Sequence, residues 1–315
     1  MAGQLSFRDG TASDLETTFT LSARAIHESA LHQGVKPPGA ELSEEELRRD
    51  WVRQRSFVEF IASQPGMYVI AEDDRGVVGY ARTVRFDGME QLTELTVMRD
   101  LRGQGVGRRL LDTVWPGAPT PDLGRVVLPT GTAADLSLCT GFGVMPVAGH
   151  WHMRQQTEAY LANRSQEIDT TDPGVHMLTP DRAVTEWKRL EPSAVAHERP
   201  SLHEFFGRDR TCLAAMDAAT GQTRALCWVS LEGEIGPAIA TSPGDLVPVV
   251  LAALDRVAMT QEPEYLGLFT TTLSWWLLRR LRTLGFAVYW PSWVLCSVPL
   301  PGLDRYLPTR PPHLL

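Results

Sequence analysis

The sequence lacks the features that mark several large functional classes. Its four cysteines are scattered and form no Cys-x-x-Cys pair, which argues against a disulfide framework and against a zinc site. No uncharged apolar run approaches the roughly 18 residues that span a bilayer. Residues 1–14 contain no basic stretch followed by an apolar core, as a secretory signal would. We therefore expect reduced thiols, no metal, no membrane partner and a cytoplasmic location.

Positive charge is also scarce. The 315 residues carry 30 lysines and arginines against 38 aspartates and glutamates, a formal net charge of −8. No basic stripe interleaved with aromatic residues is present, and binding to a nucleic acid backbone needs many basic contacts. Nucleic acid is therefore a poor candidate partner. The acidic balance gives a weak hint toward amine ligands.

The length of the chain and one polar segment predict two domains. A chain of 315 residues exceeds the usual size of a single domain. Residues 156–174 are polar, lack apolar periodicity and end in Asp172-Pro173-Gly174, so we interpret them as a linker. This places one domain at residues 1–155 and the other at residues 175–315.

In the first domain the pattern predicts a strand, two helices, three strands, a glycine turn with its helix, and closing strands. Ser13 with Glu16, and Ser43 with Glu46, have capping-box spacing, so a helix should begin close to each serine. The predicted strands cover residues 5–8, 67–71, 77–84, 92–98, 125–128, 142–147 and 149–153.

The most informative stretch runs from Leu95 to Leu111. Strand-forming residues end in a charged turn, and apolar residues recur at helical spacing after the glycines. Gly103, Gly105 and Gly107 leave no Cβ to block an approaching anion. The helix N-terminus adds unpaired N–H groups and the positive end of the helix dipole. The stretch therefore predicts an anion cradle.

The spacing within this turn discriminates among ligands. A dinucleotide fingerprint would need a third glycine where Arg108 or Leu110 stands, and the Gly-Lys-Ser/Thr triplet of a triphosphate loop is absent. What remains is Arg-x-x-Gly-x-Gly, filled by Arg102, Gly105 and Gly107 after a Leu-x-Val strand end. This pattern resembles the GNAT N-acetyltransferase superfamily, whose members hold the pyrophosphate of acetyl-coenzyme A on such a turn.

The resemblance implies a fold and a set of cofactor contacts. The fold would be α/β of the α+β kind: two GNAT-like domains, each with a mixed, mostly antiparallel central sheet flanked by helices. Acetyl-coenzyme A would be the co-substrate, with backbone contacts from Leu95 and Val97 to its pantetheine arm. The pyrophosphate would be held by the turn and the first residues of the helix: Arg102, Gly103, Gln104, Gly105, Val106, Gly107 and Arg108.

The catalytic residues depart from the family pattern. The family often places a glutamate eleven positions before the motif arginine, where this chain has Gln91. Glu90 and Glu94 flank it, and a strand bulge could turn either toward the site; we prefer Glu94 as the base. The alternative interpretation of Glu90 and of Glu94 is an ordinary strand carboxylate exposed to solvent. Ser137 stands where many relatives have a tyrosine acid, and it could orient a water or be an ordinary surface serine.

The second half partly repeats the first. Its predicted strands cover residues 175–178, 211–215, 225–231 and 235–240, and its helices residues 181–190 and 246–259. Thr270-Thr271-Thr272 leads through a helix to Gly285-Phe286, which resembles the end of the first half and suggests a diverged second GNAT domain. Where its phosphate turn should lie there is one glycine, no arginine, and Asp245, which would cap the helix and repel a pyrophosphate. We expect one coenzyme A site per chain.

Two further groups allow more than one interpretation. His150 and His152 should share one face of a strand, where they could bind a metal, contact an acceptor or form ordinary hydrogen bonds. Several tryptophans could stack on an aromatic substrate or simply form the core, and the helical spacing of Trp276 with leucines favours the core. These tryptophans are Trp228, Trp275, Trp276, Trp290 and Trp293.

Together these patterns predict an acetyl-coenzyme A-dependent N-acetyltransferase. A small-molecule or peptide amine would attack the thioester directly. The alternative is a catalytically weak acyl-coenzyme A sensor or interaction module, because Gln91 and Ser137 replace residues on which many relatives depend.

Overall fold

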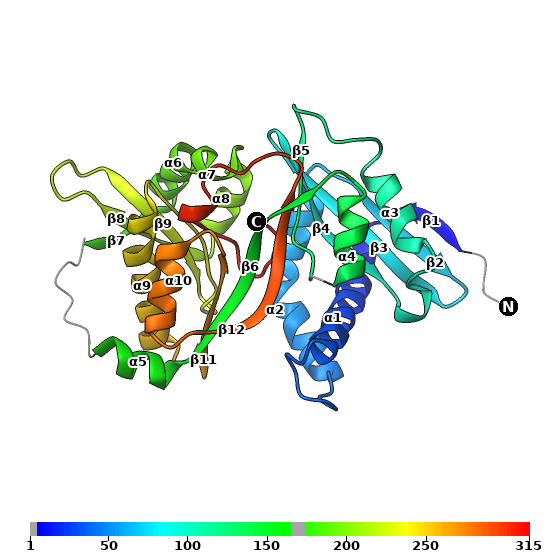
Figure 1. Ribbon diagram of the computed structural model, residues 1–315, viewed down its shortest axis with the longest axis horizontal. Coiled ribbons are helices and arrows are strands. Elements are labelled where there is room, and N and C mark those ends of the chain that lie inside the picture. The colour runs from blue at the N-terminus through cyan, green and yellow to red at the C-terminus, as the bar shows by residue number, and fades with distance from the viewer. Residues whose placement is uncertain (1–4, 131, 166–173) are drawn as a thin grey trace. The chain divides into compact units, whose positions relative to one another are not determined.

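The computed structural model describes residues 5–130, 132–165 and 174–315, and its contacts divide the chain into two compact units (Figure 1). Unit 1 comprises residues 1–145 and 296–298, and unit 2 comprises residues 146–295 and 299–315. The units therefore do not follow a single boundary in the sequence. Segment 296–298 joins unit 1 because the Ser297 N–H donates to the Arg125 carbonyl (2.9 Å) and the Arg125 N–H donates to Ser297 Oγ (2.7 Å).

Unit 1 alternates strands and helices in the predicted order. Its elements are β1 (Ser6–Asp9), η1 (Ala12–Asp14), α1 (Leu15–His32), α2 (Glu44–Ser63), β2 (Tyr68–Asp73), β3 (Gly76–Phe86), β4 (Met89–Val97), η2 (Arg99–Leu101), α3 (Val106–Val114), β5 (Gly124–Val127) and α4 (Ala133–Thr140). The strands lie in the order β1-β2-β3-β4-β5. All neighbours pair antiparallel except β4 and β5, which pair parallel.

Local hydrogen bonds set where the first two helices begin. The predicted capping box at Ser43 is present: its hydroxyl accepts from the Glu46 N–H, and the Glu46 carboxylate accepts from the Ser43 N–H. The predicted box at Ser13 is wrong. Thr11 and Asp14 form the box instead, and Arg8 binds Asp14 through two nitrogens at 2.9 and 2.8 Å, which lowers the pKa of that carboxyl.

Unit 2 contains most of the long strand β6 (Met145–Gln156) and everything that follows it except segment 296–298. Its remaining elements are α5 (Thr157–Ser165), β7 (Val175–Leu178), α6 (Pro180–Leu190), α7 (Pro192–Val195), α8 (Pro200–Phe206), β8 (Arg210–Met216), β9 (Thr223–Ser230), β10 (Ile235–Ala240), α9 (Pro243–Thr260), β11 (Tyr265–Thr271), α10 (Trp275–Thr283), β12 (Ala287–Cys296), η3 (Leu303–Arg305) and β13 (Tyr306–Leu307). β7 and β10 have the predicted bounds.

Two predictions for the middle of the chain are wrong. The two closing strands expected at 142–147 and 149–153 form the single strand β6, and the first part of the expected linker is the helix α5. The rest of that linker, residues 166–173, lies outside the described residues. β11 pairs with β6 antiparallel from Thr271 opposite His150 to Tyr265 opposite Gln156, and this pairing extends along β6 past residue 153, the predicted end of the second strand.

Five strands of unit 2 form one sheet in the order β13-β10-β9-β8-β7, and β6 lies between β12 and β11. Helix α9 packs on β8, β9 and β10. Its apolar face joins strand residues in a core that includes Leu246, Val250, Leu254, Cys227 and Ile235. Burial of this apolar surface stabilises unit 2.

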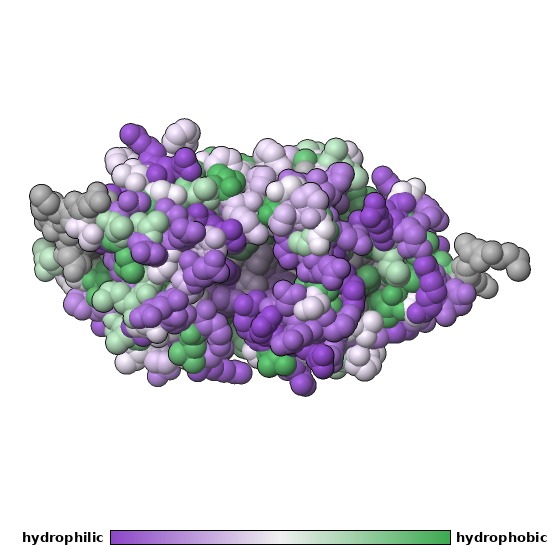
Figure 2. Space-filling model, turned by 90° about the horizontal axis from the view of Figure 1, so that it is seen from below, coloured by the Kyte–Doolittle hydropathy of each residue, from purple (hydrophilic) through white to green (hydrophobic). Residues whose placement is uncertain are grey.

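The two units thus confirm the predicted fold class: mixed, mostly antiparallel sheets flanked by helices. All four cysteines are free and buried, as expected. Among the described helices, none has both the length and the apolar character needed to cross a membrane. Hydrophilic residues predominate on the face of the molecule that Figure 2 displays.

His150 and His152 are neutral residues of the folded sheet. The His150 side chain is 1% exposed, its Nδ1 lies 2.9 Å from Ser292 Oγ, and its ring stacks on Phe269 at 4.7 Å. Burial lowers the pKa of each imidazole to about 3. Among the described residues no group of three His, Cys, Asp or Glu side chains is placed to hold a metal ion.

This burial predicts a pH dependence of stability. Because the folded-state pKa of His150 is depressed, its contribution is present above the unfolded-state pKa near 6.5 and is lost as the pH falls below that value. At pH 5 the loss is about 2 kcal/mol. Chemical denaturation at pH 7 and pH 5 should show a smaller pH effect in His150→Asn than in the wild type. Equal pH effects would contradict a neutral, buried His150.

Candidate functional site

The candidate site begins where β4 ends. After Val97 the chain passes through η2 and a short turn into α3, with Gly105 as the helix N-cap. Gly103 and Gly105 have φ values of +77° and +83°, in the left-handed region that glycine adopts without strain. A Cβ built on either glycine would meet no atom within 4 Å. The backbone of the turn can therefore be approached closely.

The start of α3 presents hydrogen-bond donors. The Arg109 N–H makes the helix's bond to the Gly105 carbonyl at 3.0 Å. The N–H groups of Val106, Gly107 and Arg108 precede that bond and have no partner within the helix. The helix dipole adds positive potential at the same place. The geometry fits a phosphate-like anion held by backbone donors.

β4 and β5 separate beside this turn. β5 pairs with β4 only from Met89 to Leu92, whereas β3 stays paired with β4 as far as Val97. In the part of the chain that the structure describes, no strand pairs with residues 93–97 on the β5 side. An extended, amide-rich ligand could pair with such a strand edge as an added strand does.

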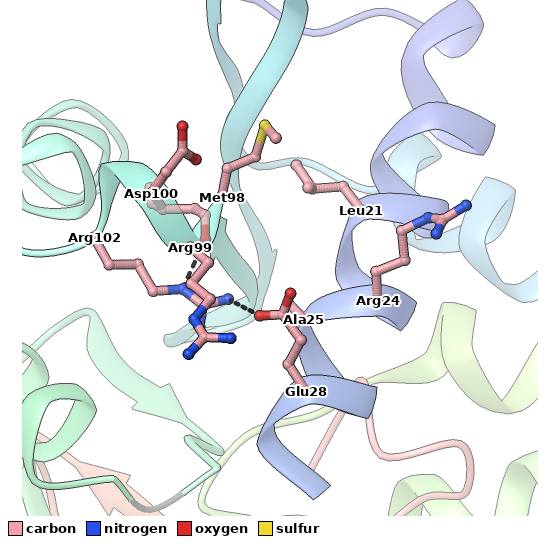
Figure 3. A pocket seen from close by; sticks show the side chains of 9 residues that line it. Leu21, Arg24, Ala25, Glu28, Met98, Arg99, Asp100 and Arg102 are labelled. Atoms are coloured by element: carbon pink, nitrogen blue, oxygen red, sulfur yellow. Dashed lines mark hydrogen bonds and ion pairs between the residues drawn. The ribbon is translucent and has the colours of Figure 1, made fainter. Parts of the chain in front are cut away.

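A pocket of about 500 Å³ lies between α1 and the end of β4 (Figure 3). It is lined by Leu21, Arg24, Ala25, Glu28, Val97, Met98, Arg99, Asp100 and Arg102. Arg102 and Glu28 point toward each other in it, with Arg102 Nη2 3.4 Å from Glu28 Oε2. Arg102 Nε donates to the Val97 carbonyl at 2.9 Å. In this conformation, therefore, the motif arginine is engaged by α1 and by its own strand.

The predicted bulge is present in β4. The register shifts between Arg82 and Thr83 of β3, so that Arg82 faces Glu94 and Thr83 faces Leu92, which leaves Thr93 as the extra residue. Glu94 lies on the same face as Arg82. Leu95 and Val97 are paired with alternate residues of β3 and lie on the other face, where a Cβ on Gly107 of α3 would be 3.8 Å from Val97 Cγ2.

Glu94 is a buried carboxylate with charged and polar neighbours. Its side chain is 7% exposed, and Oε2 lies 3.5 Å from Arg82 Nε and accepts from Thr93 Oγ1 at 2.9 Å. Arg82 is itself buried, with its guanidinium 4.3 Å from the Tyr68 ring centroid. Burial would lower the pKa of Arg82, but the Glu94 charge raises it above its ordinary value. Glu94 is therefore not the solvated strand carboxylate of the alternative interpretation.

The remaining candidate residues from the sequence analysis, Ser137, Gln91 and Glu90, lie on the helix or strand that was expected for each. Ser137 is exposed on α4. Gln91 is buried, and Glu90 accepts from Arg85 at 3.2 Å. Sequence reasoning missed Arg82 and Glu28, because neither lies at a fixed spacing from the glycine motif. Only the β3 register and the packing of α1 bring them to the site.

The matching place in unit 2 is built differently. Ser242, rather than the predicted Asp245, is the N-cap of α9; its hydroxyl accepts from the Asp245 N–H. The Asp245 carboxylate remains in the first turn and pairs with Arg224 at 2.9 Å. β13 pairs with β10, with Leu307 opposite Ala238, so a segment of the chain occupies that strand edge. Both features disfavour a pyrophosphate and its arm there.

The tryptophans divide between core and surface. Trp228 is buried and donates from Nε1 to His203 Nδ1 at 3.2 Å. Trp276, which its spacing placed in the core, is 66% exposed, and its neighbour Trp275 is 68% exposed. The core prediction for Trp276 is therefore wrong. Both stand in the first turn of α10, whose buried side is formed by Leu277 and Leu281.

Comparisons with known proteins agree with this geometry. Residues 64–129, which span β2 to β5 and include the glycine turn, match the family model described as an acetyltransferase (GNAT) domain. No curated protein matches the sequence.

Solved structures resemble the whole chain. A putative acetyltransferase from Pyrococcus horikoshii is 14% identical, with a TM-score of 0.68 over 96% of this chain and 92% of that one. A GCN5-related N-acetyltransferase from Sphaerobacter thermophilus is 18% identical, with a TM-score of 0.57 over 95% and 97%. A tandem GNAT protein from the clavulanic acid biosynthesis pathway is 18% identical, with a TM-score of 0.56 over 94% and 99%. At these identities the likeness establishes the fold.

The Arg102 contacts predict an effect of Glu28 on anion binding. A ligand phosphate at the turn would compete with Glu28 for Arg102 and would be repelled by the Glu28 carboxylate. We expect Glu28→Gln to strengthen coenzyme A binding roughly two- to fivefold, the range of a partly exposed ion pair. The dissociation constant of coenzyme A is measured by calorimetry at low and at moderate salt. Glu45→Gln, the same charge change at an exposed site on α2, should have no effect; weaker binding by Glu28→Gln would refute the competition.

Proposed function

We propose that this chain, which carries a GNAT acetyltransferase domain, transfers the acetyl group of acetyl-coenzyme A to an amine. The observation that carries the proposal is the combination, within unit 1, of an open glycine turn at the start of α3 with the unpaired edge of β4. A helix N-terminus suits a pyrophosphate, and a strand edge suits an arm made of amides.

The position of each residue in the turn, at the start of α3 or at the end of β4 suggests which part of acetyl-coenzyme A it would bind. The N–H groups of the turn and of the first turn of α3 would hold the pyrophosphate, with Arg102 and Arg108 adding positive charge. The backbone of Leu95 and Val97 would bind the pantetheine arm. Acetyl-coenzyme A supplies an acyl group activated as a thioester. The Val97 carbonyl becomes available to the arm once Arg102 turns from it toward phosphate.

Acyl transfer to an amine requires a neutral nucleophile and a route for its proton. We assign proton removal to Glu94, directly or through a water. Arg82 and Thr93 fix the orientation of its carboxylate, and the bulge sets which face of β4 it occupies. Ser137, exposed on α4, would orient a water for the departing thiolate; its hydroxyl is a weak acid. The acceptor would be a small-molecule or peptide amine.

Unit 2 would act as a diverged GNAT domain without a coenzyme A site of its own. Asp245 in the first turn of α9 and the pairing of β13 with β10 support this assignment. The second candidate function is an acyl-coenzyme A sensor with little catalysis. The pairing of Glu94 with Arg82 favours it, because a carboxylate engaged by a buried guanidinium is a less available proton acceptor.

Thiol release separates the two functions. Purified protein with acetyl-coenzyme A is mixed with amines of several classes, including small amino compounds, aminoglycosides and peptide N-termini, and free thiol is followed over time. Acceleration by one class, with the acetylated amine found by mass spectrometry, supports the transferase. Binding of acetyl-coenzyme A with no acceleration by any amine supports the sensor.

Gly105→Glu should abolish coenzyme A binding. The new carboxylate would lie over the N–H donors of α3, and we expect at least about a tenfold loss of affinity from charge repulsion alone. Gly117→Glu is a matched control, since Gly117 also has a left-handed φ of +71° and no atom within 4 Å of a built Cβ. Both variants strain the backbone alike. Unchanged affinity in Gly105→Glu by calorimetry would exclude the turn as the site.

Glu94→Gln should lower kcat for the accelerating amine by about a hundredfold or more, as expected for loss of a general base. Acetyl-coenzyme A affinity should change little. Glu90→Gln is the control, because Glu90 is a buried carboxylate on the same strand that pairs with Arg85 instead. A thermal melt checks that each variant is folded. Full activity of a folded Glu94→Gln would assign Glu94 a structural role only.

A further inference from the structure

We propose that unit 2 contains a separate binding site for a small carboxylate, centred on Arg154. A pocket of about 210 Å³ lies at the neighbouring ends of β6, β11 and β12. It is lined by Arg154, Gln155, Gln156, Tyr265, Ala287, Val288 and Tyr289. None of these residues has a part in the proposed transfer reaction.

Two aromatic rings fix the Arg154 guanidinium. Its Cζ lies 4.0 Å from the Tyr265 ring centroid and 3.9 Å from the Tyr289 ring centroid. At such distances the carbon lies over the face of each ring, because an approach to a ring edge would leave a longer distance to the centroid. Tyr265 is on β11 and Tyr289 on β12, which flank β6 on opposite sides. The guanidinium is therefore held between the rings, with its N–H groups directed outward from the stack.

In the described part of the chain, no acidic side chain pairs with this guanidinium. Among the described residues Arg154 contacts the rings of Tyr265 and Tyr289 and forms no ion pair with a carboxylate, and the described pocket lining contains no Asp or Glu. His152 lies on the same face of β6. Burial, together with the positive charges of Arg310 and Arg154, lowers its pKa to about 3, so the ring is neutral. Arg154 thus gives the pocket a positive charge that no acidic residue of the described lining compensates.

The lining defines the class of ligand. A guanidinium offers two parallel N–H groups that match the two oxygens of a carboxylate. Ala287, Val288 and the faces of the tyrosine rings supply apolar wall beside it. The pocket therefore fits a carboxylate attached to a compact apolar body, and the fixed guanidinium loses little freedom when it binds.

Benzoate is the probe, and benzamide, which has the same shape without the charge, is its matched control. Binding to the full chain is measured by ligand-observed NMR titration. We expect benzoate to bind at least tenfold more tightly than benzamide. Arg154→Gln should remove this difference, and Arg154→Lys, which keeps the charge but not the paired N–H groups, should weaken benzoate severalfold. Tyr289→Leu should also weaken benzoate severalfold.

Arg256→Gln controls for the change in net charge, because Arg256 is a partly exposed residue of α9 in the same unit, and its guanidinium donates to the Met177 sulfur. It should leave benzoate binding unchanged. Gly105→Glu should also leave it unchanged, which separates this site from the phosphate turn. The proposal is overturned if benzoate and benzamide bind alike, or if Arg154→Gln or a folded Arg154→Lys binds benzoate as the wild type does.

Discussion

The separation of β4 from β5 after Leu92 is the constraint on which the candidate site depends. β3 stays paired with β4 as far as Val97 across the bulge at Thr93, whereas the other edge of β4 has no strand partner after Leu92 among the described residues. That edge ends directly in the glycine turn and the N-terminus of α3. A ligand with an anionic end and an amide arm can therefore meet backbone donors of the helix and of the strand in sequence, without any specific side chain.

The same constraint explains why side chains at this site can vary. Backbone N–H groups of Val106 to Arg108 do not depend on residue type, but two positive φ angles require glycine at 103 and 105. The bulge at Thr93 turns Glu94 toward Arg82, a buried charge that needs a carboxylate. In unit 2 the matching strand edge is paired with β13, and an acidic residue stands at the helix start. The strand edge before α9 therefore differs from the edge of β4, which has no strand partner after Leu92 among the described residues.

Particular residues show where sequence patterns stop being reliable. Ser43 caps its helix as predicted because its partner, Glu46, is only three residues away. Asp14 instead forms a capping box with Thr11 and also binds Arg8 of β1, a residue outside the predicted box. Trp276 has core spacing but lies on the exposed side of α10, because Leu277 and Leu281 form the side that packs. β6 extends to Gln156, beyond its predicted end, where it pairs with β11, a strand more than a hundred residues later in the chain.

The sequence by itself determined the order of the elements of unit 1, the fold class and the glycine turn, whose resemblance to the GNAT pattern underlies the proposed pyrophosphate site. These depend on residues within one turn or one strand of each other, where spacing translates directly into geometry. Only the tertiary structure decided that Glu94 faces Arg82, that Glu28 engages Arg102, and that Tyr265 and Tyr289 enclose Arg154. Each of these contacts joins different strands or helices, and strand register and helix packing, which fix such contacts, leave no signal in a single sequence.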